Sequence, residues 1–411
     1  MSNDGRDRHW RSSRLSQLGS SIFAEVASWK REAMAGGRDM IDLGIGSPDR
    51  PPLASVRNAL SEAALREDSY AYPAVGSGMP FKEAAAAWML HRFGVQADPA
   101  SELVTLMGSQ DGLAHLAMAI CDPGDKALLP DPGYPIYGAS LALAGVQAEL
   151  MPLREENDYL PDLDGIPSPV WDAAKFILVN YPNNPLSAIA DLSFYERLLH
   201  KAKKHDVLVV HDLAYSELAF DGCRPPSMLQ LPGAFHHIVE FHSLSKSFNM
   251  AGCRIGFLVG NRDAVSALRE LKDNIDYGVF TPVQEAGIAA LREAMADDGR
   301  ASVSAVYERR RDSFVEALRA EGWTVDKPKA TMFIWAKLPK MGWDKGSDWS
   351  SRTISQEMLH SCGVAIIPGE AFGSEGEGYV RIALVEEEAR LLEAARRIGC
   401  FIRGEYRDIG G

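Results

Sequence analysis

One lysine of this 411-residue chain has neighbours that suit covalent chemistry. Lys246 stands between two hydroxyl residues, Ser245 and Ser247, and Arg254 follows after a short loop. Apolar runs that predict buried strands lie on either side of this stretch. A lysine at the end of a strand, flanked by hydroxyls and backed by an arginine, can form a Schiff base beside a phosphate group. The competing interpretation is a solvated lysine in a polar loop.

Two strands upstream end in polar residues that could complete such a site. The apolar run 206–211 ends in Asp212, and Tyr215 follows three residues later. A second apolar run, 175–179, leads into an Asn-Pro turn at Asn184. In open α/β sheets the active-site groups lie at the strand ends, so these side chains are predicted to lie near one another.

The order and spacing of these motifs resemble the fold-type I aminotransferases of class I and II, which depend on pyridoxal 5'-phosphate (PLP). The motifs are Asn-Pro, Asp-x-x-Tyr, Ser-x-Ser-Lys and a later Arg, here Asn184-Pro185, Asp212 to Tyr215, Ser243 to Lys246, and Arg254. The resemblance runs from about Asp42 to Arg381. It implies an amino acid and a 2-oxo acid as substrates, and a homodimer with shared active sites. Many members continue Asn-Pro with Thr-Gly, whereas Leu and Ser follow here, which changes the turn rather than the chemistry.

The resemblance implies a catalytic role for three residues. Lys246 would form the Schiff base and move the substrate α-proton, and Asp212 would keep the pyridine nitrogen protonated. Tyr215, with Asn184, would hydrogen-bond the ring hydroxyl. Because a lysine has an ordinary pKa of about 10.4, it can act as a base only where an imine linkage and nearby cations, such as Arg254, favour its neutral form.

Further segments are predicted to bind the cofactor. A strand at 103–107, a small-residue turn and a helix offer free N–H groups to an anion, and Asp111 is predicted as a helix-start residue rather than a phosphate contact. A Pro-Gly turn presents Tyr134, whose ring could stack on a pyridine, whereas Tyr137 is predicted to pack. The implied cofactor-binding set is Ser109, Gln110, Tyr134, Asn184, Asp212, Tyr215, Ser243, Ser245, Lys246, Arg254 and, from the other subunit of a dimer, Tyr72.

One arginine stands in an otherwise apolar strand near the C-terminus. Arg381 lies within 378–384, and a buried guanidinium needs a paired anion. The resemblance implies that Arg381 binds the substrate α-carboxylate, which suits the planar fork of an arginine, and a structural salt bridge is the alternative. The implied substrate-binding set is Gly46, Asn184, Arg381 and Tyr72. His211 and His242 are predicted on the opposite strand faces, as core or supporting residues, and no metal site is expected.

Strands and helices alternate from 103 to 260, which predicts an α/β fold with a mostly parallel sheet between helices. The resemblance implies that this sheet is the seven-stranded-type sheet of the PLP-transferase fold. A smaller α/β C-terminal domain is predicted from helices at 285–295, 303–321 and 386–402 and from one strand each at 333–338 and 364–367. We expect an N-terminal arm and substrate-covering loop at 1–50, a large PLP-binding domain at 51–285, and a small domain at 286–411 that includes part of the arm.

Composition restricts the partners and the compartment. A formal net charge of −13 argues against nucleic acid or an anionic membrane as a partner. No apolar run reaches the ~20 residues that a membrane helix needs. Five scattered cysteines without paired spacing are typical of cytoplasmic proteins.

The motifs resemble most the branch that contains LL-diaminopimelate aminotransferases and bacterial alanine aminotransferases. The resemblance implies LL-diaminopimelate and 2-oxoglutarate as the substrates, and alanine, methionine or aromatic amino acids remain open as donors. A PLP-dependent C–S lyase or synthase would keep Lys246 and Asp212 but eliminate rather than transfer. A non-catalytic regulator domain would need an attached DNA-binding domain, for which roughly 40 N-terminal residues leave little room.

Overall fold

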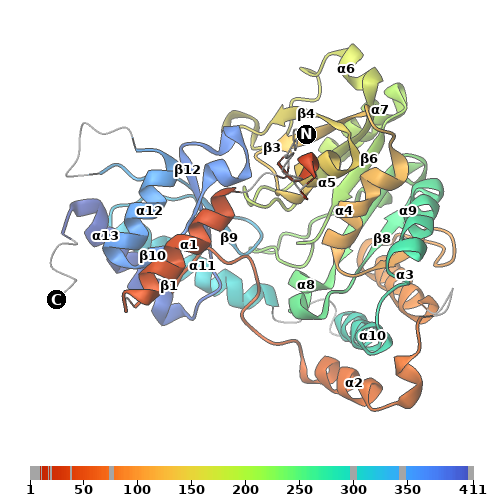
Figure 1. Ribbon diagram of the computed structural model, residues 1–411, viewed down its shortest axis with the longest axis horizontal. Coiled ribbons are helices and arrows are strands. Elements are labelled where there is room, and N and C mark those ends of the chain that lie inside the picture. Colours follow the sequence, from red (N-terminus) through yellow and green to blue (C-terminus); the bar gives the residue numbers. More distant parts are fainter. Residues whose placement is uncertain are drawn as a thin grey trace, which may run out of the picture.

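The computed structural model describes residues 10, 12–16, 18, 21–37, 39–73, 78–296, 303–341 and 349–405. Two lobes lie side by side (Figure 1). The larger lobe is built on a seven-stranded sheet and the smaller on a three-stranded sheet. Among the described helices, none is long and apolar enough to cross a membrane.

The sheet of the large lobe is mostly parallel, as predicted. Its strands are β2 (Leu103–Leu106), β3 (Lys126–Asp131), β4 (Gln147–Pro152), β5 (Ala174–Asn180), β6 (Leu208–Asp212), β7 (Ile238–Ser243) and β8 (Gly256–Gly260). Their order is β2-β8-β7-β6-β5-β3-β4, and within this sheet only β8 runs opposite to the other strands. The polar C-terminal ends of β5, β6 and β7 therefore lie at one edge.

Helices cover both faces of this sheet because neighbouring apolar side chains of each strand point to opposite faces. Val209 packs into the apolar cluster of one face and Val210 into that of the other. The first face is covered by α2 (Ala54–Ala64), α3 (Met79–Phe93), α6 (Ser168–Ala173), α7 (Leu192–His205) and α10 (Thr281–Ala296). The second is covered by α4 (Ser109–Ile120), α5 (Ile136–Ala144) and α9 (Arg262–Ile275).

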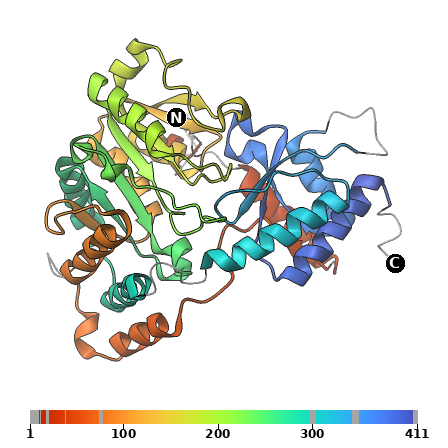
Figure 2. The same cartoon turned by 180° about the vertical axis from the view of Figure 1, so that it is seen from behind.

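The small lobe has an antiparallel sheet and helices that include the N-terminal one. Its strands are β9 (Phe333–Lys337), β11 (Ile367–Pro368) and β12 (Tyr379–Ala383), in the order β11-β12-β9. Its helices are α1 (Ser21–Ala35), α11 (Val303–Ala320), α12 (Ser351–Cys362) and α13 (Glu388–Arg403). Figure 2 shows α11, in cyan, extending along this lobe from the side that faces the large lobe.

The single strand predicted at 364–367 is wrong. The chain changes partner there, because β10 (Val364–Ala365) pairs in parallel with β1 (Ile41–Asp42) whereas β11 pairs with β12. Ile366 separates the two short strands, and β1 ties the segment after α1 to the small lobe.

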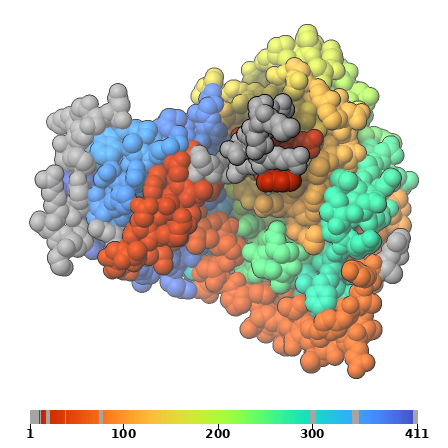
Figure 3. Space-filling model, in the orientation of Figure 1, coloured from red at the N-terminus to blue at the C-terminus, as the bar shows by residue number. Residues whose placement is uncertain are grey.

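The N-terminal helix α1 lies on the surface of the small lobe, against α12 (Figure 3). An ion pair of 3.1 Å joins Glu25 to Arg352 at this contact. The predicted boundary between 285 and 286 falls inside α10, which packs against α2 and α3 of the large lobe. We therefore propose that the lobe boundary follows α10.

Candidate active site

A cavity of about 320 Å³ lies between the lobes, at the C-terminal ends of β5, β6 and β7. Apart from Tyr72, every predicted site residue lines it, namely Gly46, Ser109, Gln110, Tyr134, Asn184, Asp212, Tyr215, Ser243, Ser245, Lys246, Arg254 and Arg381. Residues of the small lobe and of the segment before α2 thus face strand ends of the large lobe.

Lys246 is held by a single turn of helix, α8 (Leu244–Ser247), that directly follows β7. Ser243 caps this turn, because its Oγ accepts a hydrogen bond of 3.2 Å from the N–H of Ser245. Lys246 Nζ donates a hydrogen bond to the carbonyl oxygen of Gly46. Burial, with Arg381 and Arg254 nearby, lowers the pKa of the Lys246 ammonium to about 8. A neutral, nucleophilic amine is therefore accessible close to neutral pH.

Asp212 ends β6 as a buried carboxylate. Its Oδ2 accepts a hydrogen bond of 2.8 Å from the Tyr137 hydroxyl, and its Oδ1 accepts one of 3.3 Å from the N–H of Ala214. Burial raises the pKa of the Asp212 carboxyl, and the bond from Tyr137 partly opposes this shift. Among the described residues, no lysine or arginine forms an ion pair with it, so the carboxylate can accept a buried cation. The interpretation of Tyr137 as a packing residue is incomplete, because its ring packs but its hydroxyl bonds Asp212.

Arg254 lies against the backbone at the start of α4. Gly108 has a φ of +76°, which favours glycine, and a Cβ there would stand 2.8 Å from Arg254 Nη2. Ser109 begins the helix there, and the first N–H groups of a helix attract anions. Arg254 has no carboxylate partner in the described chain, and its Nη1 donates to the carbonyl of Ala251. A guanidinium beside a helix N-terminus fits a phosphate.

Asp111 does not belong to this anion site, as predicted. It is the third residue of α4, and its Oδ2 accepts a hydrogen bond of 2.9 Å from the N–H of Met107. Lys272 of α9 forms an ion pair with the same carboxylate. Its charge is therefore neutralised away from Arg254.

Arg381 projects from β12 and is buried. Its Nη1 donates to Asn184 Oδ1 and its Nη2 to the carbonyl of Gly44, each across 3.0 Å. The guanidinium carbon lies 4.2 Å from the ring centroid of Phe333 and 4.8 Å from that of Phe372.

This arginine has no carboxylate partner within the described residues, so a structural salt bridge is not what retains it. Its Nε has no hydrogen-bond partner, and burial lowers the pKa of Arg381 to about 10. An unpaired, buried and still charged fork is suited to a bound carboxylate.

Two tyrosines of the predicted set lie on the cavity wall. Tyr134 donates a hydrogen bond of 3.1 Å to Gln110 Oε1, and its ring meets that of Tyr137 edge-on at 5.9 Å. Tyr215 packs edge-on against Phe333 at 6.0 Å, and burial raises the pKa of its phenol. Its hydroxyl therefore stays protonated and can donate.

Tyr72 lies outside this cavity and is 85% exposed. Its ring contacts Tyr277, with centroids 5.6 Å apart, and Tyr70 contacts Phe280 at 5.7 Å. These four exposed rings (Tyr70, Tyr72, Tyr277 and Phe280) are termed the aromatic patch below. Nothing in the described part of this subunit brings Tyr72 to the cavity of its own chain.

The two histidines that flank site residues are core residues, as predicted. His211 is fully buried, and its ring nitrogens contact Glu240 at 3.0 Å and the carbonyl of Tyr181 at 3.1 Å. His242 stacks on Phe257 at 4.8 Å. Neither lines the cavity.

Some residues that shape this site were not predicted from the sequence. Phe23 of α1 lines the cavity and meets Phe372 edge-on at 5.6 Å. Asn180 Nδ2 donates to the carbonyl of Asp212 across 2.7 Å. In the sequence, Phe23 lies in an apolar stretch and Asn180 at the end of a strand, and neither pattern distinguishes a site residue from an ordinary core residue.

The donor set of this cavity fits PLP. A buried carboxylate without a cation suits a protonated ring nitrogen, and a partly neutral lysine suits an aldehyde. A guanidinium at a helix start suits a phosphate, and a second unpaired guanidinium suits an amino-acid carboxylate.

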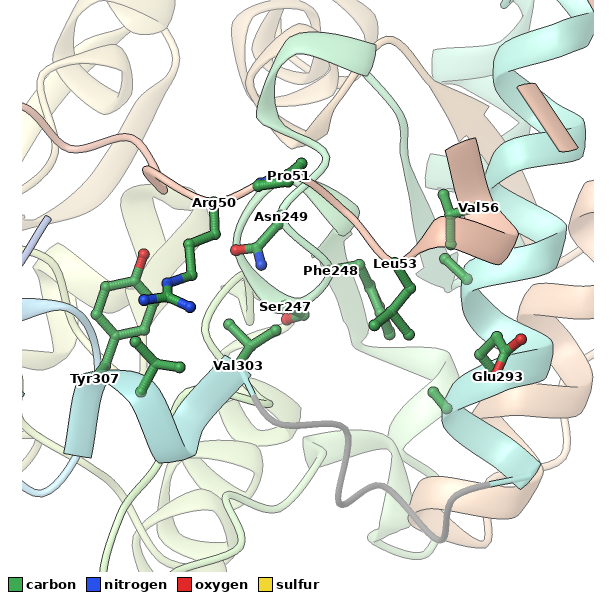
Figure 4. A pocket seen from close by; sticks show the side chains of 13 residues that line it. Arg50, Pro51, Leu53, Val56, Ser247, Phe248, Asn249, Glu293, Val303 and Tyr307 are labelled. Carbon is green, nitrogen blue, oxygen red and sulfur yellow. The ribbon is translucent and has the colours of Figure 1, made fainter. Parts of the chain in front are cut away.

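A second cavity, of about 290 Å³, is lined in part by Ser247, Phe248 and Asn249, which follow Lys246 in the chain (Figure 4). Its wall is mostly apolar and includes Leu53, Val56, Phe248, Val303 and Tyr307, with Arg50, Ser247, Asn249 and Glu293. It contains none of the groups just described, so the chemistry belongs to the first cavity.

Comparisons with known proteins agree with this geometry. The family described as aminotransferase class I and II matches residues 38–398. LL-diaminopimelate aminotransferases from Gloeobacter violaceus and Moorella thermoacetica are each 43% identical, over 94% of this chain and 96% of theirs.

Two solved structures have the same overall fold as this chain. BacF from Bacillus subtilis superposes with a TM-score of 0.88 at 35% identity, over 96% of this chain and 98% of that one. A probable N-succinyldiaminopimelate aminotransferase from Thermus thermophilus superposes with a TM-score of 0.86 at 40% identity, over 92% and 99%.

Proposed function

Because the chain belongs to the class I and II aminotransferases, which are PLP-dependent transaminases, we propose that it transfers an amino group from LL-diaminopimelate to 2-oxoglutarate. The observation that carries this choice of amino donor is the 42–43% identity, over 94% of this chain, to relatives named LL-diaminopimelate aminotransferase. When bound, PLP supplies an aldehyde that bonds amines and an electron-withdrawing ring that stabilises negative charge at the α-carbon.

In this proposal two residues move or hold protons, and three others contact the cofactor ring. Lys246 Nζ would hold the cofactor aldehyde and, once displaced by the substrate amine, would act as the base that takes and passes on the α-proton. Asp212 would keep a proton on the ring nitrogen, because an ionised carboxylate beside the ring stabilises its positive charge. Tyr215 and Asn184 hydrogen-bond the ring hydroxyl oxygen, and Tyr134 covers one face of the ring.

The phosphate is held at the start of α4 in this proposal. Backbone N–H groups of Ser109 and Gln110 face it from the helix, and Arg254 supplies the cation. Ser243 and Ser245 also line the cavity and are assigned to the cofactor.

The substrate α-carboxylate is assigned to Arg381. Hydrogen bonds to Asn184 and Gly44 and the two phenylalanine rings hold the guanidinium in place before a ligand arrives. Gly46 belongs to the segment that covers the substrate, and its carbonyl orients Lys246.

We further propose that the active form is a cytoplasmic homodimer. The aromatic patch is an exposed apolar surface of a kind that a second copy of this chain would cover. In that dimer the partner subunit's Tyr72 would complete the phosphate site.

One observation favours the alternative of an alanine, methionine or aromatic amino-acid donor. The cationic residues that line the cavity in the described chain are Lys246, Arg254 and Arg381, and each already has a role. Phe23 and Ile45 are apolar wall residues. A donor without a second charged end needs no further cation, whereas LL-diaminopimelate carries a distal ammonium and carboxylate.

A donor screen tests the proposal. PLP-loaded protein is incubated with LL-diaminopimelate, alanine, methionine or phenylalanine, with 2-oxoglutarate or pyruvate as acceptor, and the new amino acid is quantified. The proposal expects the highest kcat/KM for LL-diaminopimelate with 2-oxoglutarate. A higher value for another donor would replace the substrate assignment, and turnover without any acceptor would indicate a lyase.

A further inference from the structure

Asp212 receives one side-chain hydrogen bond in the described part of the chain, and its donor is Tyr137. The hydroxyl lies 2.8 Å from Oδ2, whereas Oδ1 is reached only by the N–H of Ala214 at 3.3 Å. Both side chains are buried, with 3% of Tyr137 and 5% of Asp212 exposed. The bond is therefore shielded from water. Hydrogen bonds to a charged group are stronger in such a buried site than in water.

Local structure explains why a tyrosine reaches this carboxylate. Tyr137 is the second residue of α5, and Tyr134 precedes the helix by two residues. The two rings pack edge-on, at an interplanar angle of 78°. One short segment thus supplies both the ring on the cavity wall and the hydroxyl that bonds Asp212.

We infer that Tyr137 is a positioning residue that keeps Asp212 ionised against the PLP ring nitrogen. The inference rests on the role proposed above for Asp212, but it is independent of the identity of the amino donor. Tyr137 acts through Asp212 and is assigned no contact with the reacting atoms.

When the cofactor is bound, one proton can reside either on Asp212 or on the ring nitrogen. Burial favours the protonated form of Asp212, and the Tyr137 hydroxyl opposes that by stabilising the carboxylate. Burial and the nearby carboxylate raise the pKa of Tyr137 well above its ordinary value, so the hydroxyl remains a donor. Without that hydroxyl, Asp212 would hold the proton itself as an O–H and would no longer keep it on the ring nitrogen. A ring that has lost this proton withdraws electrons less strongly.

The test replaces Tyr137 with phenylalanine in enzyme loaded with PLP that carries ¹⁵N in its ring. The ¹⁵N chemical shift reports whether the ring nitrogen is protonated before any substrate is added. We expect Tyr137→Phe to move this shift toward the unprotonated value. We also expect kcat to fall about 10- to 100-fold, the range of one hydrogen bond to a charged group, with a smaller change in KM.

Tyr181→Phe is the matched control. Tyr181 is also a buried tyrosine, and its hydroxyl donates across 2.7 Å to the carbonyl of Tyr159. It should leave the ¹⁵N shift unchanged. A wild-type ¹⁵N shift in Tyr137→Phe would overturn the inference, whereas an unprotonated ring in the wild type would overturn the role of Asp212 itself.

A second pair of variants keeps the inference testable if Tyr137→Phe does not fold. Tyr137→Phe combined with Asp212→Asn removes the hydroxyl and the charge together. The double variant therefore has no buried carboxylate that lacks a hydrogen-bond donor, which is the cause of misfolding to be avoided. If Tyr137 acts through Asp212, the double variant has the same ¹⁵N shift and kcat as Asp212→Asn. A further change in either quantity would contradict the inference.

Discussion

Arg381 and Asn184 are joined by a hydrogen bond of 3.0 Å that crosses from the small lobe to the large one. Arg381 belongs to β12, and Asn184 to the turn that follows β5. This bond therefore fixes the position of Arg381, the proposed ligand of the substrate carboxylate, relative to Asn184, a proposed ligand of the cofactor ring hydroxyl. Separation of the lobes at this point would break this hydrogen bond.

Replacing Arg381 by alanine should impair substrate binding rather than cofactor binding. Loss of a buried charged contact costs about 2–5 kcal/mol, so kcat/KM for every amino donor should fall about 30- to 5,000-fold. Steady-state kinetics measures this fall, and the visible absorbance of bound PLP should be retained. Arg381→Lys keeps the charge but not the fork and should give an intermediate value. An unchanged KM in the alanine variant would return Arg381 to a structural role.

Replacing Lys246 by alanine should abolish transamination, because it removes the nucleophile and the base together. A fall of more than about 10⁴-fold in kcat is expected, with loss of the absorbance band of the lysine-linked cofactor. Lys201→Ala is the control, since that lysine forms a surface ion pair of 2.7 Å with Asp164. Wild-type activity in Lys246→Ala would refute the mechanism.

The lowered pKa of Lys246 also predicts how the stability of the cofactor-free protein depends on pH. Between about pH 8 and 10.5 the unfolded lysine binds a proton that the folded one has released, so stability rises with pH across this window. Below pH 8 both states are protonated, and the folded state carries the full cost of the buried charge, at most about 3 kcal/mol.

Denaturant titration of cofactor-free wild type and Lys246→Met measures this effect. Methionine has no charge to bury, so the variant should be the more stable protein at pH 7. Its advantage should shrink as pH rises from 8 to 10. An advantage that does not change over that range would show that the Lys246 ammonium is not destabilised by the fold.

Gly373 should tolerate no side chain, because it lies against Asp131 where the lobes meet. An added Cβ would stand 1.9 Å from Asp131 Oδ1, and its φ is +136°. Ser374 Oγ donates to the same carboxylate across 2.7 Å, so the two segments cannot move apart freely. We expect Gly373→Ala to lower the free energy of unfolding by about 2–4 kcal/mol.

Gly378→Ala is the matched control for that measurement. Gly378 also has a positive φ, of +85°, but a Cβ there would meet nothing within 4 Å. It should therefore cost only about 1 kcal/mol of backbone strain. Equal losses in the two variants would show that contact with Asp131 is unimportant.

The strand ends of the large lobe were predictable from the sequence, whereas the contacts made by the small lobe were not. Asp212 and Lys246 each follow an apolar run, and parallel strands bring such ends to one edge. Phe23 and Phe372, by contrast, meet only because α1 folds onto the small lobe. No local pattern marks that contact, which depends on tertiary packing.

The strand error at 364–367 has the same origin. Four consecutive apolar residues satisfy the pattern of one buried strand, and only the positions of β1 and β12 divide them. The hydroxyl of Tyr137 was missed because a tyrosine on a buried helix face usually packs. Its hydrogen bond depends on where β6 places Asp212.

Tyr72 is exposed in its own subunit and is proposed to reach the active site of the other subunit. If the partner subunit's Tyr72 completes the phosphate site, Tyr72→Ala should weaken PLP affinity about 10-fold, because a hydrogen bond to a charged phosphate is lost. An exposed tyrosine without such a role would have no effect. Equilibrium dialysis at limiting PLP measures the change.

Hybrid dimers distinguish a shared site from a site within one subunit. Tyr72→Ala and Lys246→Ala chains are co-expressed so that they form a hybrid dimer. If each cavity takes its Tyr72 from the other subunit, one cavity of the hybrid has both changes and the other has neither. At limiting PLP this hybrid should be more active than either parent dimer, because its intact cavity combines Lys246 of one chain with an unaltered Tyr72 from the other. If Tyr72 served its own cavity, both cavities of the hybrid would be defective. Activity no higher than that of the parents would therefore reject the shared site, and with it the proposed function of the aromatic patch.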